Sequence, residues 1–311
     1  MTLHTMKRTF KYTLLLILAL VAGSGSLLAQ QQQMFTQYMF NQLAINPAYA
    51  GTDNAANITF LTRHQWIGVE GAPSTQTLSM HAPFPKRKIG LGLQIINDKI
   101  GPINQFGLYA SYAYLIPMSF GTLSAGLQVG FNTYREDLTG IRTSSPDAAF
   151  GDVVSAFLPN AGAGVWFHAE DWYVGVSLPQ MINHSVTSAD SEVASTLVRH
   201  WFFTSGYVYP INADIKLKPN VLMKVVQGAP VQFDLNLNVL FQDVLWAGVS
   251  WRSFDSFDFL VEALVTPQLR FGYSYDTSTS ALRLVNSGSH ELMLNYRLAF
   301  EKDRLLTPRY F

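Results

Sequence analysis

The sequence predicts an all-β fold, a transmembrane antiparallel β-barrel of about fourteen strands. Three observations predict it: apolar and polar residues alternate, charged residues are scarce, and turn residues divide the chain at even intervals. The alternation is clearest at 123–132, 231–241 and 269–276. Because successive side chains of a strand point to opposite faces, each of these segments has one apolar and one polar face.

The composition limits what kind of protein this is. Of the 311 residues 14% are charged, with 21 basic and 21 acidic side chains and no cysteine, whereas soluble domains are about 25% charged. A net charge of zero gives no electrostatic reason to expect nucleic acid as a partner. The lack of cysteine excludes a thiolate nucleophile, a disulfide framework and a lipidated amino-terminal cysteine.

The first 29 residues have the pattern of an export signal. Lys7, Arg8 and Lys11 precede an apolar run at 14–22, and small residues follow up to Ala29. This order predicts a signal peptide over 1–29, cleaved after Ala29. An uncleaved anchor helix is the alternative, but the apolar run is shorter than the roughly 20 residues that a span requires.

The barrel is expected over 56–300, followed by a tail at 301–311. Polar gaps at 136–159 and 183–195 are expected to be surface loops on the cell exterior, where such barrels have their longer connections. The last strand must pair with the first, since an open edge is not tolerated in lipid. The expected strands are 57–69, 74–82, 87–97, 104–118, 122–135, 160–168, 171–177, 196–209, 213–226, 231–242, 244–252, 256–265, 267–276 and 289–300.

Aromatic residues gather towards the ends of these strands, as at Tyr112, Trp166, Trp201 and Trp246. Aromatic girdles at the two membrane interfaces would explain this placement. A secreted β-sandwich would share the alternation and could use the same residues in its core. Even spacing, low charge and polar faces rich in Gly, Ser, Asn and Gln favour the barrel.

The segment before the first strand, 30–55, does not alternate and is too aromatic and too poor in charge for a plain linker. It is expected either to fold into the barrel mouth as a plug or to remain periplasmic and bind a partner. The candidate plug or partner-docking residues are Tyr38, Phe40, Asn41, Asn46, Pro47 and Tyr49.

A polar and aromatic cluster follows in the first strand. An arginine facing lipid would cost about 2–4 kcal/mol at the midplane, so Arg63 is expected at the lumen or rim. There it could contact Asp98 or the side chains of Asn41 and Asn46; a surface for binding a partner is the alternative. The candidate lumen or rim network is Arg63, His64, Gln65, Trp66 and Asp98.

No catalytic constellation stands out. The histidines after residue 29 are scattered without metal-ligand spacing, and no Gly-x-Ser-x-Gly or phosphate-binding glycine loop occurs. His290 and Glu291 are expected to be a solvated strand start rather than a catalytic pair. The sequence therefore predicts no enzyme and no cofactor.

Several stretches resemble one family. They are the signature Gln37–Gly51, which contains Asn-Pro-Ala-Tyr-Ala-Gly, then Arg63–Trp66, Gly71–Gln76, Gly90–Gly92 followed by Asn97–Asp98, and Phe271–Asp276. Together they resemble the PorP/SprF family of Bacteroidetes outer-membrane proteins, and the resemblance covers about residues 33–300.

The resemblance implies a non-enzymatic outer-membrane component of the type IX secretion and gliding machinery. Its implied partners are periplasmic and outer-membrane secretion components, a secreted adhesin and outer-membrane lipid. Two alternatives remain open at this point. One is an outer-membrane transporter of hydrophobic small molecules, for which a plug would also make sense, and the other is a purely structural anchor.

Overall fold

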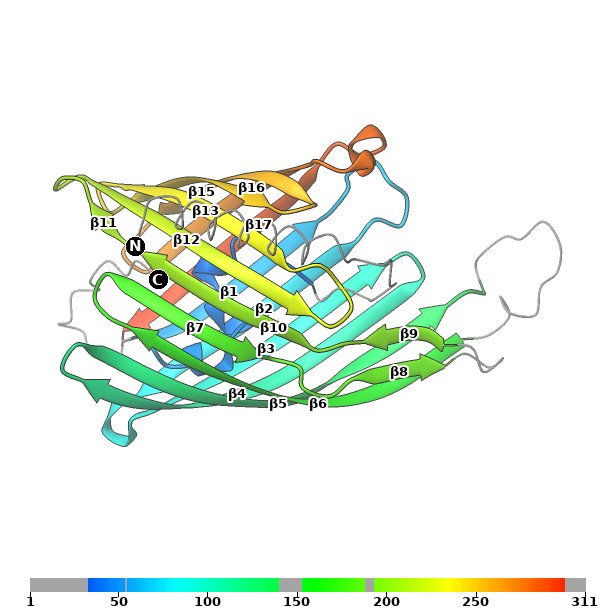
Figure 1. The fold of residues 1–311 in the computed structure, drawn as a ribbon, viewed down its shortest axis with the longest axis horizontal. Helices are drawn as coiled ribbons and strands as arrows, with labels where there is room; N and C mark the ends of the chain where they lie inside the picture. Colours follow the sequence, from blue (N-terminus) through cyan, green and yellow to red (C-terminus); the bar gives the residue numbers. More distant parts are fainter. Residues whose placement is uncertain (1–32, 54, 140–152, 188–192, 300–311) are drawn as a thin grey trace, which may run out of the picture.

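A computed structural model describes residues 33–53, 55–139, 153–187 and 193–299. The predicted leader and tail lie outside these residues. Within them fourteen strands form the barrel (Figure 1): β1 (Ala55–His64), β2 (Ser74–Phe84), β3 (Ile89–Ile100), β4 (Ile103–Met118), β5 (Gly121–Asp137), β6 (Val153–His168), β7 (Trp172–Leu178), β10 (His200–Tyr207), β12 (Ile215–Val226), β13 (Gln232–Phe241), β14 (Leu245–Arg252), β15 (Ser256–Leu264), β16 (Leu269–Ser278) and β17 (Ser289–Ala299).

The strands pair antiparallel in chain order and close into a ring. β1 pairs with β17 from Ala55↔Ala299 to His64↔His290, so the first and last strands form the seam that the sequence predicts. On the other side, β10 pairs with both β7 and β12. A bridge of two residues, β11 (Tyr209–Pro210), extends the edge of β12. Closure gives the barrel strands neighbours on both sides in the spanning region, as a membrane barrel requires.

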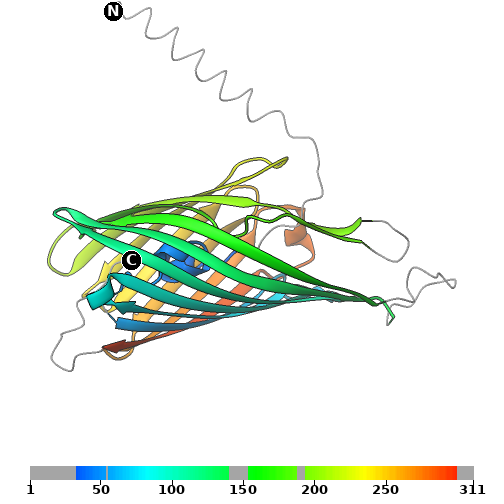
Figure 2. The same ribbon diagram turned by 90° about the horizontal axis from the view of Figure 1, so that it is seen from below.

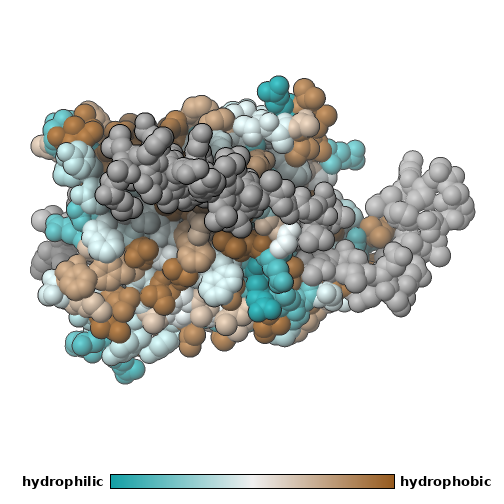
Figure 3. Space-filling view, in the orientation of Figure 1, coloured by the Kyte–Doolittle hydropathy of each residue, from teal (hydrophilic) through white to brown (hydrophobic). Residues whose placement is uncertain are grey.

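The alternation of the sequence separates the two faces of the wall. In β17, Leu294 faces outward and is 45% exposed, while the adjacent Met293 and Asn295 point inward and are buried. The same arrangement holds around the ring, and apolar residues cover much of the visible outer surface (Figure 3). The outer face therefore suits lipid, and the polar face lines the lumen.

The two ends of the barrel differ in their connections. The turn end carries short links such as 119–120 between β4 and β5 and 242–244 between β13 and β14. The loop end, on the right in Figure 1, carries the longest connections, 65–73, 138–152, 179–199 and 279–288. Outer-membrane barrels have short periplasmic turns and longer exterior loops, so the loop end faces the cell exterior.

Short 3₁₀ helices complete the described secondary structure: η1 (Tyr38–Phe40), η2 (Gln42–Ala44), η3 (Pro47–Tyr49), η4 (Pro85–Arg87) and η6 (Ala281–Leu284). The described part of the chain contains no helix with the length and apolar character needed to cross a membrane.

Two details at the loop end differ from the sequence prediction. The surface loop predicted at 183–195 carries a hairpin of β8 (His184–Thr187) and β9 (Val193–Leu197). Val186 of this hairpin packs on Tyr134 and Leu158, which explains why a short hairpin is held there. β6 also begins at Val153, well before the expected 160.

The predicted aromatic girdle is only partly correct. Tyr112 and Trp201 face outward and are exposed. Trp166 and Trp246 instead point into the lumen and are buried. A one-residue change of position along a strand moves a side chain to the other face, and clustering near strand ends does not say which face an aromatic residue takes.

Candidate functional site in the barrel lumen

The lumen holds the amino-terminal part of the described chain, residues 33–53, here called the lumen segment. It is drawn in dark blue inside the ring of strands in Figures 1 and 2. From Phe35 to Asp53 every residue is buried except Phe40, which is half-buried. Asn46 caps η3 by accepting a hydrogen bond from the Ala48 amide at 2.9 Å, with Pro47 at the first helical position. The segment thus consists of three short 3₁₀ turns, of which η3 has a side-chain cap.

The first anchor of the lumen segment lies near the loop end. The carboxylate of Glu291 accepts hydrogen bonds from the backbone amides of Thr36 and Gln37 at 2.9 and 2.8 Å. Asp276 accepts one from the Thr36 hydroxyl at 2.7 Å. Arg63 pairs with Asp276 at 2.5 Å and with Glu291 at 3.2 Å, and it also donates to the Thr36 hydroxyl at 2.9 Å. Charges from β1, β16 and β17 therefore hold two consecutive residues of the segment.

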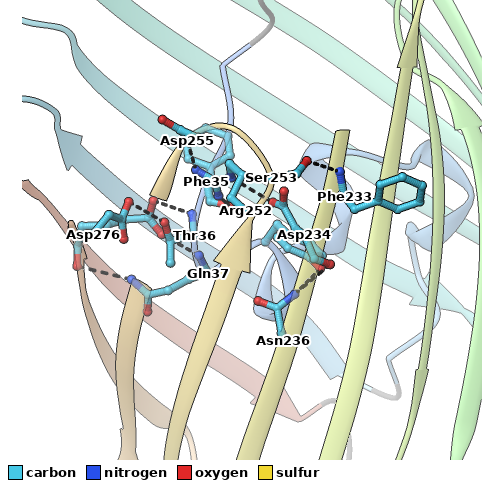
Figure 4. Close-up of polar contacts among 12 residues, drawn as sticks. Phe35, Thr36, Gln37, Phe233, Asp234, Asn236, Arg252, Ser253, Asp255 and Asp276 are labelled. Carbon is cyan, nitrogen blue, oxygen red and sulfur yellow. Dashed lines mark hydrogen bonds and ion pairs between the residues drawn. The ribbon is translucent and has the colours of Figure 1, made fainter. Parts of the chain in front are cut away.

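A second charged residue, Arg252, holds Phe35, the residue just before Thr36 (Figure 4). Arg252 donates from Nη2 to the carbonyl oxygen of Phe35 at 3.4 Å. Its Nε pairs with Asp234 at 3.0 Å and its Nη1 with Asp255 at 3.4 Å. Asp234 and Asp255 fix the guanidinium of Arg252 in place. Its remaining donor, Nη2, binds the lumen segment.

The middle of the segment bridges opposite walls. On one side the Tyr38 hydroxyl lies between Asn220 at 3.2 Å and Asn236 at 2.7 Å. The Lys218 ammonium lies 5.0 Å from the centre of the Phe40 ring and 5.4 Å from that of Trp246. On the other side the contacts are Asn41 to Ser79, Ser177 to the carbonyl of Ile45, Asn46 to the carbonyl of Val165, and Ser124 to the carbonyl of Ala48.

Glycines of the wall let the segment backbone come close. A Cβ at Gly126 would collide with the backbone of Pro47 and Ala48, and one at Gly90 with the carbonyl of Ala50. Both glycines lie on the inward face of their strands. Their role is to admit backbone where any larger residue would fill the space.

We expect Gly126→Val to displace η3, because overpacking a filled site costs about 1–3 kcal/mol. Limited proteolysis of the detergent-purified protein should then cut within the lumen segment. Ala125→Val is the matched control, since Ala125 lies next to Gly126 on the exposed outer face. Equal protease resistance of the two variants would contradict the close contact.

The last anchor lies at the turn end, where the segment leads into β1. Arg297 of β17 donates from Nε and Nη2 to the two carboxylate oxygens of Asp53, at 3.0 and 2.9 Å. This two-pronged geometry is the strong form of an arginine–carboxylate pair. Since Thr36 is held near the loop end and Asp53 at the turn end, the chain runs through the lumen from the exterior end towards the periplasmic end.

An apolar layer crosses the lumen between the two ends. Leu260 is its member on β15, with Asp258 on its loop-end side and Glu262 on its turn-end side. The charged residues of the lumen thus lie on both sides of the layer. Its buried members are Phe35, Tyr38, Met39, Ala44 and Ile45 of the segment and Leu61, Phe202, Leu222 and Leu260 of the wall.

The structure brings the six candidates from the amino-terminal signature together in the lumen: Tyr38, Phe40, Asn41, Asn46, Pro47 and Tyr49. Tyr49 makes edge contacts with the rings of His81 and Trp166, with centroids 5.3 Å apart in each pair.

The residues of the candidate lumen or rim network do not all face the lumen. Arg63 faces the lumen, but it contacts Thr36, Asp276 and Glu291 rather than the expected Asp98, Asn41 or Asn46. Asp98 faces the lumen further round the ring and accepts hydrogen bonds from Thr75 at 2.5 Å and Gln33 at 3.1 Å.

His64 follows Arg63 directly and therefore points to the outer face, because strand residues alternate. Gln65 and Trp66 lie beyond β1, in the 65–73 loop. The four consecutive residues 63–66 consequently do not form one lumen network.

Sequence reasoning missed the most important partner. Glu291, expected to be solvated, is fully buried and binds the segment backbone. The available signal was its place in the alternation: Glu291 precedes Met293, Asn295 and Arg297 on the inward face of β17. A charged residue that falls at the same alternate positions as the inward-facing residues of its strand is expected to point into the lumen.

A closed barrel of fourteen strands with an apolar exterior and a filled polar lumen defines an outer-membrane β-barrel protein. The family model described as type IX secretion system membrane protein PorP/SprF matches residues 27–296. The chain therefore belongs to the PorP/SprF family, which is a family of secretion-system membrane proteins rather than of enzymes. The protein is located in the outer membrane.

The solved structures that the chain resembles are distant from it in sequence. The CymD monoaromatic hydrocarbon channel is 11% identical, with 88% of this chain and 95% of that chain covered and a TM-score of 0.50. The Pseudomonas putida toluene transporter TodX is 11% identical over 88% and 95%, with a TM-score of 0.46. Omp33 of Acinetobacter baumannii is 9% identical over 80% and 100%, with a TM-score of 0.48. No curated protein matches the chain.

Proposed function

We propose that this protein is a non-enzymatic outer-membrane component of the type IX secretion and gliding machinery that supports export or surface attachment of a secreted adhesin. It would do so through protein–protein contacts and not by transporting a substrate through its lumen. The observation that supports protein contacts rather than transport through the lumen is that the lumen is filled: Phe35 to Asp53 lie inside it, and all of them except the half-buried Phe40 are buried. A polypeptide could not pass while these residues remain in place.

The domain boundaries follow from the same proposal. Residues 1–29 would be a leader, 30–55 the plug, 56–300 the barrel and 301–311 a tail. The six signature residues Tyr38, Phe40, Asn41, Asn46, Pro47 and Tyr49 would then act as plug residues. Arg63 and Asp98 would act from the lumen wall, while His64, Gln65 and Trp66 remain available at the exterior end.

The test is to cross-link intact cells, purify this protein from the outer membrane and identify the attached proteins by mass spectrometry. Type IX components or a large secreted adhesin should be recovered with it. An unrelated outer-membrane barrel, purified in the same way, is the control. If this protein is recovered alone, or with the same set of proteins as the control, the proposal is wrong.

Transport of hydrophobic small molecules is the alternative. It requires a route past the apolar layer of the lumen, which contains Tyr38 and Leu260. Uptake of a labelled monoaromatic compound by cells that contain the protein, above the level of cells that lack it, would favour this alternative. Equal uptake in the two strains would favour the secretion role.

A further inference from the structure

A row of polar side chains crosses five strands on the outer face near the loop end. Inward neighbours such as Arg63 and Glu291 are buried, so the residues of the row point outward. Strand register places them side by side around the wall: Tyr275↔His290, His290↔His64, His64↔Ser74 and Ser74↔Lys99.

The row lies on the loop-end side of the apolar wall, and on β1, β2 and β3 the polar residues Thr62, Gln76 and Asn97 separate the two. Four residues further from the loop end, the same strands present the apolar side chains of Phe271, Leu294, Phe60, Leu78 and Ile95 in register. Outer-membrane barrels carry an apolar band bounded by polar and aromatic residues at each interface. The row therefore lies at the level of the headgroups of the exterior leaflet.

The 65–73 loop forms a pocket of about 350 Å³ beside this row. His64, Ser74 and Lys99 contribute its polar lining from three adjacent strands. Its other lining residues come from the loop and the neighbouring turn and are mostly apolar or glycine: Gln65, Trp66, Ile67, Gly68, Val69, Gly71, Ala72, Pro73 and Gly101.

The loop that forms the pocket is fixed on both sides. Its Ile67 amide donates to the carbonyl of Gly288 at 2.9 Å, and the Gly101 amide donates to the carbonyl of Gly71 at 2.8 Å. Trp66 has φ of +48°, a conformation that a bulky residue adopts only where the surroundings impose it. The pocket is therefore preformed, as small-molecule sites usually are.

The charges of the pocket favour an anion. Lys99 is exposed, and among the described residues its ammonium group has no hydrogen-bond or ion-pair partner. The His64 ring is held by the hydroxyls of Ser74 at 3.2 Å and Thr62 at 3.3 Å, which fix its position. Glu70 belongs to the same loop but does not line the pocket.

We propose that this pocket binds the phosphorylated headgroup of an exterior-leaflet lipid. Lys99 and the Ser74 hydroxyl would contact the phosphate, because an ammonium group and a hydroxyl donor suit its oxygens. His64, whose two ring nitrogens are bonded to Ser74 and Thr62, would hold the Ser74 hydroxyl in place. The acyl chains would lie along the apolar stripe of Phe60 and Leu78, which begins four residues below the row, past the polar pair Thr62 and Gln76. That stripe distinguishes a lipid from a free anion, since only a lipid can occupy pocket and stripe together.

The test uses the full chain in detergent and diphosphoryl lipid A in mixed micelles, with binding measured by native mass spectrometry. Lys99→Gln combined with His64→Gln should weaken binding about tenfold, as expected for the loss of one charge-assisted contact. Lys99→Arg should retain binding. Lys86→Gln, in the exposed turn at the opposite end, is the matched control and should bind like the unchanged protein.

Three results would overturn the proposal. The double variant could bind as tightly as Lys86→Gln, dephosphorylated lipid A could bind as tightly as the diphosphoryl form, or inorganic phosphate could displace the lipid at equal concentration. The last result would assign the pocket to a free anion. All of the altered side chains are exposed, and heat-modifiable migration on gels confirms that each variant is folded.

Discussion

Arg63→Met should loosen the lumen segment. Removing the arginine leaves Asp276 and Glu291 buried without their cation, at 2% and 0% exposure. Breaking a buried ion pair from one side costs about 3–5 kcal/mol. We expect a lower temperature of heat modification and protease cleavage within residues 33–53.

The matched control is Arg135→Met. Arg135 pairs with Asp137 at 3.5 Å, but the two side chains are 63% and 40% exposed. An exposed pair contributes about 0–1 kcal/mol, so this variant should behave like the unchanged protein. Adding Asp276→Asn and Glu291→Gln to Arg63→Met removes the uncompensated charges and should restore part of the lost stability. If Arg63→Met and Arg135→Met behave alike, the lumen anchor is unimportant.

Replacing residues 35–49 by a Gly-Ser linker of equal length should leave a folded barrel that no longer supports secretion. The wall should survive, because the hydrogen bonds between the barrel strands and the β1–β17 seam do not involve the segment. The function should be lost, because the segment carries the candidate plug or partner-docking residues. The measurement is the amount of surface-exposed adhesin on intact cells.

The control for this experiment is the same amount of barrel in the outer membrane, verified by heat-modifiable migration. Ala125→Val serves as the comparison strain, since it changes only the lipid-facing wall. Unchanged surface adhesin in the linker variant would show that the lumen segment has no part in secretion. The barrel would then remain a membrane anchor that acts through its loops.

Strand positions could be predicted from the sequence because period-two alternation directly reports a half-buried wall. The expected segments 231–242 and 289–300 lie within a residue or so of β13 and β17. The hairpin of β8 and β9 was not foreseen, because its pairing is short and depends on packing against Leu158. Local pattern does not encode such a contact.

The candidate site was only partly predictable for a similar reason. The aromatic residues of the amino-terminal segment indicated a plug or a docking element, but they did not say which wall residues they would contact. Two partners of Thr36, Asp276 and Glu291, are separated from it by 240 and 255 positions. Pairing at such separations is set by closure of the barrel. The alternation along β17 does assign Glu291 to the inward face, and this assignment is enough to predict that Glu291 is buried.

Single-channel conductance of the purified intact chain in a planar bilayer tests the central claim most directly. The claim is that the protein's own lumen segment closes the barrel. The intact chain should show no steady conductance, and the variant with the 35–49 linker should conduct ions continuously. A steady open pore in the intact chain, of the same size as in the linker variant, would contradict the account.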